Sequence, residues 1–243
     1  MSNIYLVRHG QAGTRDAYDS LSELGRRQAR LLGEYFVSQG IEFRAGYVGA
    51  MSRQQQTAAQ VRAAYEAAGA SFPEVTVESG WDEFDLHQVY RELAPRLCEE
   101  DAEFRRDYEE MRAEVAASAG AEDAEVHRRW RPCDTKVVEA WFAGRYAYTG
   151  ETWEQFRGRV AACRLQLGEV ERDANVAVFT SATPTAIWAG LALGGIPDER
   201  VRQIAGVLRN SSFTVLHLRG DELRLFSFNE TPHLTLPELR THR

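Results

Sequence analysis

Cysteine is scarce in this sequence, and the few cysteines are scattered. Cys98, Cys133 and Cys163 are odd in number, far apart and without the short spacings of metal-binding motifs. A disulfide framework and a zinc site are therefore not expected, and no metal or other cofactor is predicted. The three residues are expected to be ordinary buried or half-buried thiols.

Long hydrophobic runs and a positive net charge are also missing. No apolar stretch approaches the roughly 20 residues that a membrane-spanning helix needs, and the chain starts with a short apolar strand instead of a signal peptide. We therefore expect a cytoplasmic protein without a membrane partner. The formal net charge of −7 at pH 7 argues against general nucleic-acid binding, which depends on a basic surface. A small anion could still bind to a local pair of arginines, for which Arg8 and Arg53 are candidates.

Apolar strands alternate with helical stretches along most of the 243 residues. This alternation predicts an α/β fold, a three-layer α/β/α sandwich with a mostly parallel central sheet. Thr183 and Pro184 are expected to be the N-cap and first residue of the helix after the fourth strand. Because there is no internal repeat or long linker, residues 1–243 are expected to form a single domain. The strands are predicted at residues 3–8, 44–51, 74–79, 175–181, 212–218 and 223–229.

One region interrupts the alternation. Residues 86–132 are charged, helical in pattern and without a strand signal. We interpret them as a helical insertion that serves as a lid over the sheet. A solvated surface insertion without such a role explains the same pattern equally well.

Charged side chains follow the first three predicted strands. Arg8 and His9 come after the first strand, Arg53 opens the helix after the second, and Glu83 follows the third. The carboxyl ends of parallel strands meet at one edge of a sheet, where α/β folds bind their ligands. A neutral imidazole can attack phosphorus, arginines can neutralise the phosphoryl oxygens, and a protonated carboxyl can supply the proton for the leaving oxygen. Each residue taken alone is more often structural, so the prediction depends on their combination.

Several motifs, in their order along the chain, resemble those of the histidine phosphatase superfamily, which is also described as phosphoglycerate mutase-like. The stretch LVRHGQ matches the Arg-His-Gly signature, and LSELGRRQA, SRQQQTA, GETWEQFRGRV and NSSFTVLHL are similar to later family segments. The resemblance covers the core of the chain and fades in the insertion. It implies that His9 is the phosphorylated nucleophile, Glu83 the proton donor, and Arg8 and Arg53 the phosphate ligands.

The second active-site histidine of the family is absent. The family continues its fourth strand into Ser-His-Gly-Gly, whereas this chain reads TSATPTA, with Ala182 in the place of the histidine. Loss of one preorganised donor typically lowers a rate by about 10²–10³. The lost contact could be replaced by Thr183 and the N–H groups of the new helix N-terminus, which is the simpler hypothesis, or by His87 or His127 from the insertion. The changed neighbours of Ala182 favour natural divergence over an engineered substitution.

The resemblance implies a phosphate monoester hydrolase that acts on a small phosphorylated substrate through phosphohistidine. Two alternatives remain open. The first is a catalytically impaired member that binds a phosphate ligand or a protein, which the loss at Ala182 favours. The second is a phosphoglycerate mutase-type phosphotransferase, which is less favoured because no additional set of basic residues is evident. The substrate and the oligomeric state are not predicted.

Overall fold

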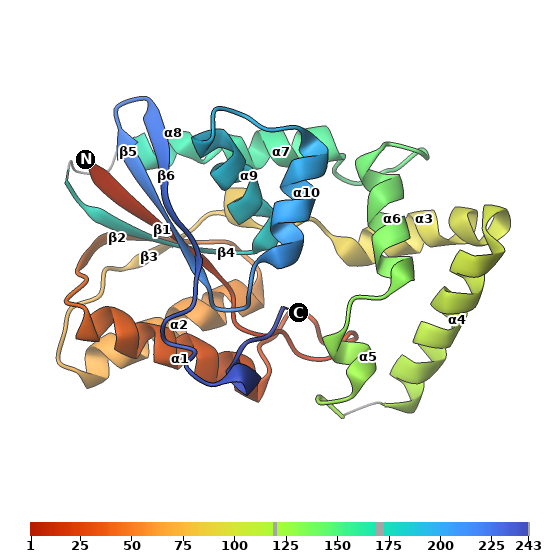
Figure 1. Cartoon of the computed structure of the whole chain (residues 1–243), viewed down its shortest axis with the longest axis horizontal. Helices are drawn as coiled ribbons and strands as arrows, with labels where there is room; N and C mark the ends of the chain where they lie inside the picture. The colour runs from red at the N-terminus through yellow and green to blue at the C-terminus, as the bar shows by residue number, and fades with distance from the viewer. Residues whose placement is uncertain (119–120, 169–172, 243) are drawn as a thin grey trace. The chain divides into compact units, whose positions relative to one another are not determined.

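The computed structural model describes residues 1–118, 121–168 and 173–242. Within these residues, one six-stranded sheet has the order β3-β2-β4-β1-β5-β6 (Figure 1). The pairs β1–β4, β2–β4 and β2–β3 are parallel, and the pairs β1–β5 and β5–β6 are antiparallel. The predicted α/β fold with a mostly parallel sheet is thus confirmed. The strands are β1 (Ser2–Arg8), β2 (Phe43–Val48), β3 (Val75–Val77), β4 (Asn175–Thr180), β5 (Phe213–Arg219) and β6 (Glu222–Glu230).

Helices cover both faces of this sheet. Figure 1 shows α1 (Glu23–Ser38) and α2 (Ser52–Ala67) below the strands and α9 (Ala182–Ala192) above them. The core on the α1 and α2 side contains Phe36 and Phe179, which are fully buried. Because β1 and β4 are central strands, covered on both faces, their sequences are nearly continuous apolar runs that end in polar residues. Arg8 and His9 lie at the end of β1, and Ala182 and Thr183 follow the end of β4.

The chain divides into two compact units. The sheet unit comprises Met1–Gly13, Tyr18–Glu83 and Val160–His242, and the helical unit comprises Thr14–Ala17 and Phe84–Arg159. The sheet unit also contains η1 (Ser79–Trp81), α8 (Arg164–Gly168), α10 (Asp198–Val207) and η2 (Pro237–Leu239).

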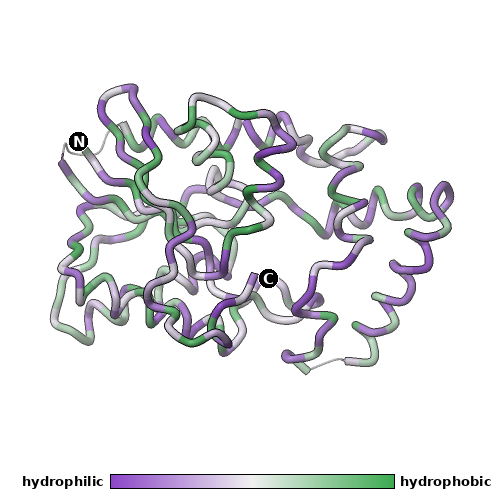
Figure 2. The backbone as a smooth tube through the Cα atoms, viewed as in Figure 1, coloured by the Kyte–Doolittle hydropathy of each residue, from purple (hydrophilic) through white to green (hydrophobic). Residues whose placement is uncertain are grey.

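The described part of residues 86–132 is helical, as expected, and includes no strand. Figure 2 shows α4 largely in the hydrophilic colour, and its buried residues are Phe104 and Met111. A single domain over residues 1–243 and a lid role for the insertion remain predictions. The helices here are α3 (Leu86–Glu100), α4 (Ala102–Ala117), α5 (Glu125–Arg128), α6 (Pro132–Phe142) and α7 (Trp153–Ala162), whose last residues extend into the sheet unit.

A buried ion pair lies within the helical unit. The Arg15 guanidinium donates to both carboxylate oxygens of Asp134, at 2.9 and 2.6 Å, and the two side chains are 8% and 0% exposed. The same carboxylate accepts hydrogen bonds from the Tyr90 hydroxyl and from the Arg131 backbone N–H. Arg15 also donates to two backbone carbonyls of the unit. The segment Thr14–Ala17 is therefore fixed to the helices by a fully hydrogen-bonded charge pair.

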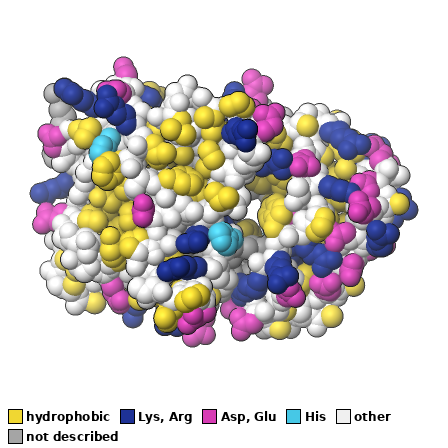
Figure 3. All heavy atoms as spheres, in the orientation of Figure 1, with side chains coloured by type: hydrophobic (Ala, Val, Ile, Leu, Met, Phe, Trp, Pro, Cys, Tyr) yellow, Lys and Arg dark blue, Asp and Glu magenta, His cyan; other side chains and the backbone are white. Residues whose placement is uncertain are grey.

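The surface agrees with an acidic protein of mixed charge. Figure 3 shows basic and acidic side chains interspersed over the helical unit, and hydrophobic side chains gathered over β5 and β6. Among the described helices, none is long and apolar enough to cross a membrane.

Candidate active site

The backbone of His9 is held between two neighbouring strands. Its N–H donates to the Thr180 carbonyl at the end of β4, at 2.9 Å, and its carbonyl accepts from the Ser211 N–H just before β5, at 3.0 Å. His9 therefore continues the hydrogen-bonded ladder beyond the last residue of β1. A side chain placed on such a rigid strand end has a well-defined direction.

Two glycines explain why the loop after His9 can approach α1 so closely. A Cβ atom on Gly10 would lie 2.3 Å from the Gly25 carbonyl oxygen, and one on Gly25 would lie 2.1 Å from the Gln11 carbonyl oxygen. Ser22 caps α1 by accepting a hydrogen bond from the Gly25 N–H at 3.0 Å. The Gln28 side chain accepts from the Gln11 N–H at 2.8 Å. The motifs LVRHGQ and LSELGRRQA thus meet across this backbone contact.

The hydrogen bonds of the His9 ring define its tautomer. Its Nδ1 lies 2.7 Å from the Gly10 carbonyl oxygen, which only accepts, and its Nε2 lies 3.2 Å from Arg53 Nε, which only donates. The proton is therefore assigned to Nδ1 and the lone pair to Nε2. Burial, and then the charges of Arg53 and Arg8, hold the pKa of His9 well below its ordinary value, against the raising effect of the Gly10 hydrogen bond. The ring is accordingly neutral near neutral pH.

Arg53 stands at the first turn of α2 and is held by a second charged residue. Its Nη1 donates to Asp19 Oδ1 at 3.0 Å, and the Tyr18 ring centroid lies 5.0 Å from its guanidinium carbon. The other oxygen of Asp19 accepts from the Ser52 N–H at 3.2 Å. The N-cap residue Met51 makes no side-chain capping hydrogen bond. Asp19 thus supplies a carboxylate to both the helix N-terminus and Arg53, a role that the sequence analysis missed.

Glu83 contacts the N-terminus of α9. Its Oε2 accepts a hydrogen bond from the Thr183 N–H at 3.0 Å. The N-cap of α9 is Ser181, so the expectation that Thr183 caps the helix and Pro184 begins it was wrong by two residues. Pro184 is tolerated as the third helical residue because the N–H groups of the first turn have no partner within the helix. This N-terminus therefore offers fewer N–H groups to a phosphate than predicted, since Thr183 already donates to Glu83 and Pro184 has none.

Ala182 begins α9, two residues after the end of β4, the strand that pairs with β1. Arg8 pairs with Thr180 in the β1–β4 ladder, so the residues after them, His9 and Ser181, occupy the next register position, directly before Ala182. Gln54 of α2 donates to Ser181 Oγ at 2.9 Å and to the Trp81 carbonyl at 3.2 Å. Gln54 therefore links α2 to the start of α9 and to the segment before Glu83. It lies in the quoted SRQQQTA motif, but its spacing alone did not reveal this bridging role.

Arg8 is directed toward the C-terminal segment. Its Nη1 donates to the Leu208 carbonyl, and its Nη2 donates to the His242 carbonyl at 2.8 Å. The hydrogen bond described for the His9 Nε2 atom comes from Arg53. Arg8 as a direct phosphate ligand remains a prediction, although its charge lowers the pKa of His9.

The histidines proposed as substitutes both belong to the helical unit. His127 is buried, and its Nδ1 accepts from the Arg15 N–H at 3.1 Å, while His87 is exposed on α3. Another histidine, His233, lies in the sheet unit, where it is buried and packs against the Tyr35 ring at a centroid distance of 6.3 Å. A catalytic contribution from His87 or His127 remains a prediction.

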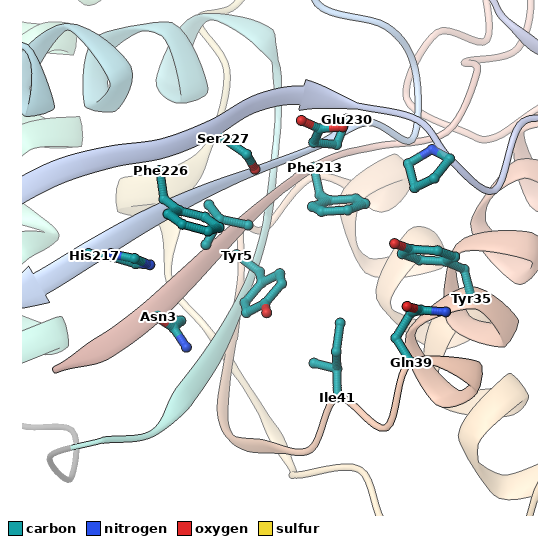
Figure 4. Close-up of a pocket in the computed structure, with 12 residues that line it drawn as sticks. Asn3, Tyr5, Tyr35, Gln39, Ile41, Phe213, His217, Phe226, Ser227 and Glu230 are labelled. Carbon is teal, nitrogen blue, oxygen red and sulfur yellow. The ribbon is translucent and has the colours of Figure 1, made fainter.

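A separate pocket of about 440 Å³ lies on the sheet between α1 and β6 (Figure 4). Its lining includes Tyr5, Tyr35, Phe213 and Glu230, but none of the predicted site residues and no lysine or arginine. This lining does not suit a phosphate, so we place the candidate site at His9. Among the described residues, no cluster of histidine, cysteine, aspartate and glutamate side chains could hold a metal ion.

Comparisons with known proteins agree with the architecture. The sequence profile of the histidine phosphatase superfamily (branch 1) matches residues 4–140 and 133–231. No curated protein matches the chain significantly.

Several solved structures share the fold. YhfR from Bacillus stearothermophilus is 16% identical, with a TM-score of 0.62 and coverage of 96% of this chain and 100% of that one. A phosphoserine phosphatase mutant from Entamoeba histolytica in complex with phosphoserine is 16% identical, with a TM-score of 0.57 and the same coverage. A phosphoglycerate mutase from Bacillus anthracis is 15% identical, with a TM-score of 0.57 and coverage of 96% and 95%.

Proposed function

Because the chain belongs to the histidine phosphatase superfamily (branch 1), we propose that it hydrolyses a phosphate monoester through a phosphohistidine formed on His9. The observation that supports this most is the ring geometry of His9. Gly10 holds the proton on Nδ1, which leaves the lone pair of Nε2 as the nucleophile. The Arg53 guanidinium already lies 3.2 Å from that atom, in position to contact a phosphoryl group bonded there.

The first half of the reaction transfers the phosphoryl group to the protein. The Nε2 lone pair of His9 attacks phosphorus in line, and the bond to the leaving oxygen breaks. Glu83, in its acid form, donates a proton to that oxygen. The Nε–H of Arg53 exchanges its acceptor from Nε2 to a phosphoryl oxygen, which stabilises the charge there.

The second half releases phosphate. A water molecule attacks phosphorus, the phosphorus–nitrogen bond breaks, and its electron pair returns to Nε2. Glu83, now a carboxylate, takes the proton of the water. Inorganic phosphate leaves, and Glu83 and His9 regain their starting protonation states.

The substrate is proposed to be a small phosphorylated molecule. The phosphoserine phosphatase and the phosphoglycerate mutase that share this fold carry such molecules in their names. The formal net charge of −7 gives no support for a polyanionic nucleic acid as substrate. Release of free phosphate, rather than its retention on a second hydroxyl, distinguishes the hydrolase from the mutase alternative.

The test compares turnover of an aryl phosphate between pH 5 and 7.5 for the protein, for His9→Ala and for the control His217→Gln, whose residue lies on β5. We expect hydrolysis that His9→Ala abolishes and that His217→Gln leaves unchanged. We also expect acid-labile phosphate on the protein after rapid quenching, which His9→Ala removes. Full activity in His9→Ala would overturn the proposal.

A second candidate function is supported by Ala182. A protein that lacks the histidine donor could bind a phosphorylated ligand without turning it over. In the variant Ala182→His, the hydrolase proposal expects a rise in an activity that already exists. Phosphate binding without turnover in the natural protein, with activity appearing only in Ala182→His, would support the binding function instead.

A further inference from the structure

Both helices that begin beside His9 already carry a carboxyl group of the protein at their N-terminus. Asp19 accepts from the Ser52 N–H of α2, and Glu83 accepts from the Thr183 N–H of α9. Helix N-termini favour anions, and arginine adds to that preference. The combination of the α2 N-terminus and Arg53, which the sequence marks as an anion site, is therefore occupied by the Asp19 carboxylate.

We propose that Asp19 competes with the phosphoryl group for Arg53 and thereby promotes release of the phosphate product. In the resting protein, the Asp19 carboxylate is bound to the Arg53 guanidinium, the group that phosphoryl oxygens are proposed to contact. An incoming phosphoryl group displaces it, and the carboxylate returns as the product leaves. This inference rests on the proposed function, because it assumes that a phosphoryl group binds Arg53 and adds that the Asp19 carboxylate competes with it.

The exposures of the two partners explain why the exchange is feasible. The Arg53 side chain is 5% exposed, whereas the Asp19 side chain is 60% exposed. A buried guanidinium beside a neutral imidazole needs a nearby negative charge. A carboxylate that is already largely solvated returns to water at little cost, and water screens its attraction to Arg53. Asp19 therefore neutralises the charge of Arg53 in the resting protein but can be displaced by another anion.

The donors of Arg53 show what the phosphoryl group must displace. Its Nε donates to His9 Nε2, and its Nη1 donates to Asp19 Oδ1. Bond formation between Nε2 and phosphorus removes the first acceptor, and a phosphoryl oxygen takes its place. A second phosphoryl oxygen that takes the Nη1 hydrogen now donated to Asp19 displaces the carboxylate from that donor. Asp19 is thus a positioning residue that acts through Arg53 and not by touching the substrate.

The experiment measures the dissociation constant of inorganic phosphate by titration calorimetry and its inhibition constant in aryl phosphate hydrolysis. The variants are Asp19→Asn, Asp19→Ser and the charge-preserving Asp19→Glu. The control Asp16→Asn removes an equal charge three residues away, from a side chain that interacts with Thr14 and His127 instead of Arg53.

We expect Asp19→Asn and Asp19→Ser to bind phosphate about twofold to fivefold more tightly, with KM lowered by the same factor. Asp19→Glu and Asp16→Asn are expected to stay close to the natural protein. A merely structural role predicts the opposite sign, since a disturbed site binds phosphate less well.

Unchanged or weaker phosphate binding in both uncharged variants would overturn this inference and leave the proposed function standing if hydrolysis still depends on His9. A natural protein that neither binds phosphate nor hydrolyses the aryl phosphate would overturn both proposals. The two failures are therefore distinguishable in one set of titrations.

Discussion

Two arginine–aspartate pairs, whose first members lie only a few residues apart in the chain, differ in the solvent exposure of their carboxylates. In the helical unit, Arg15 and Asp134 are 8% and 0% exposed, and in the sheet unit, Arg53 and Asp19 are 5% and 60% exposed. The guanidinium is buried in both pairs, so the carboxylate makes the difference. A buried carboxylate keeps its contact with the arginine, because leaving it would cost too much. An exposed carboxylate can be replaced on the arginine by another anion.

The hydrogen bonds around each carboxylate support this comparison. Asp134 accepts from both terminal nitrogens of Arg15, from the Tyr90 hydroxyl and from the Arg131 N–H. Asp19 accepts one hydrogen bond from Arg53 and one from the Ser52 N–H among the contacts described. The first pair is suited to stabilising a fold, and the second is suited to a site that must accept and release an anion.

The largest expected effect is a difference in the free energy of unfolding between variants of the two pairs. Asp134→Asn leaves the Arg15 guanidinium buried without its counter-charge, so we expect the free energy of unfolding to fall by about 3–5 kcal/mol. Asp19→Asn is expected to cost less, because water screens the attraction between Arg53 and a carboxylate that is 60% exposed. Urea unfolding followed by circular dichroism measures both.

The double variant Arg15→Met/Asp134→Leu serves as the control for this prediction. Because it removes both charges, we expect it to be less destabilised than Asp134→Asn alone. Equal losses in Asp134→Asn and Asp19→Asn would break the comparison between the pairs.

The next largest effect concerns Arg53 and the proposed phosphatase activity. Arg53→Met removes the donor that we place on the transferring phosphoryl group, so we expect kcat/KM for an aryl phosphate to fall about 10²–10³-fold. Arg53→Lys keeps the charge but not the planar donor set, and it should recover part of the loss. Steady-state kinetics at pH 6.5 measures this, with circular dichroism to confirm folding. A loss below threefold in Arg53→Met would remove Arg53 from the mechanism.

The smallest effect concerns pH. Burial, Arg53 and Arg8 keep the pKa of His9 well below 6.5, so its imidazole stays neutral as the pH falls through that value. We therefore expect no loss of kcat/KM near pH 6.5 that is due to His9. Arg53→Met should move the acid limb of the profile toward 6.5, but only partly, because burial is the larger cause. An acid limb at 6.5 in the natural protein would contradict this assignment.

The site residues whose position could be predicted from the sequence are those that directly follow a recognisable strand or open a recognisable helix. His9 and Arg8 follow an apolar strand, and Arg53 opens a helix, so their placement at one sheet edge needed only the strand and helix pattern. The N-cap of α9 was misplaced because Ser181, Thr183 and the intervening Ala182 all precede an apolar helix, and the local pattern does not distinguish the two hydroxyl residues. The extended backbone of Ser181 decides it.

The contacts that the sequence could not reveal join residues far apart in the chain. Asp19 meets Arg53 across 34 positions, and Arg15 meets Asp134 across 119. Nothing in the local composition distinguishes these aspartates from the other acidic residues of the chain, because a carboxylate gains its role from the partner that folding brings to it.

The sequence by itself determined the alternation of strands and helices, the family, and the order of the charged strand ends, since periodicity and motifs are local properties of the chain. Only the tertiary structure decided which nitrogen of His9 is available, which carboxylate sits on Arg53, and which ion pair is buried. Those properties depend on hydrogen-bond partners and solvent exposure, and both are set by packing between segments that the sequence keeps apart.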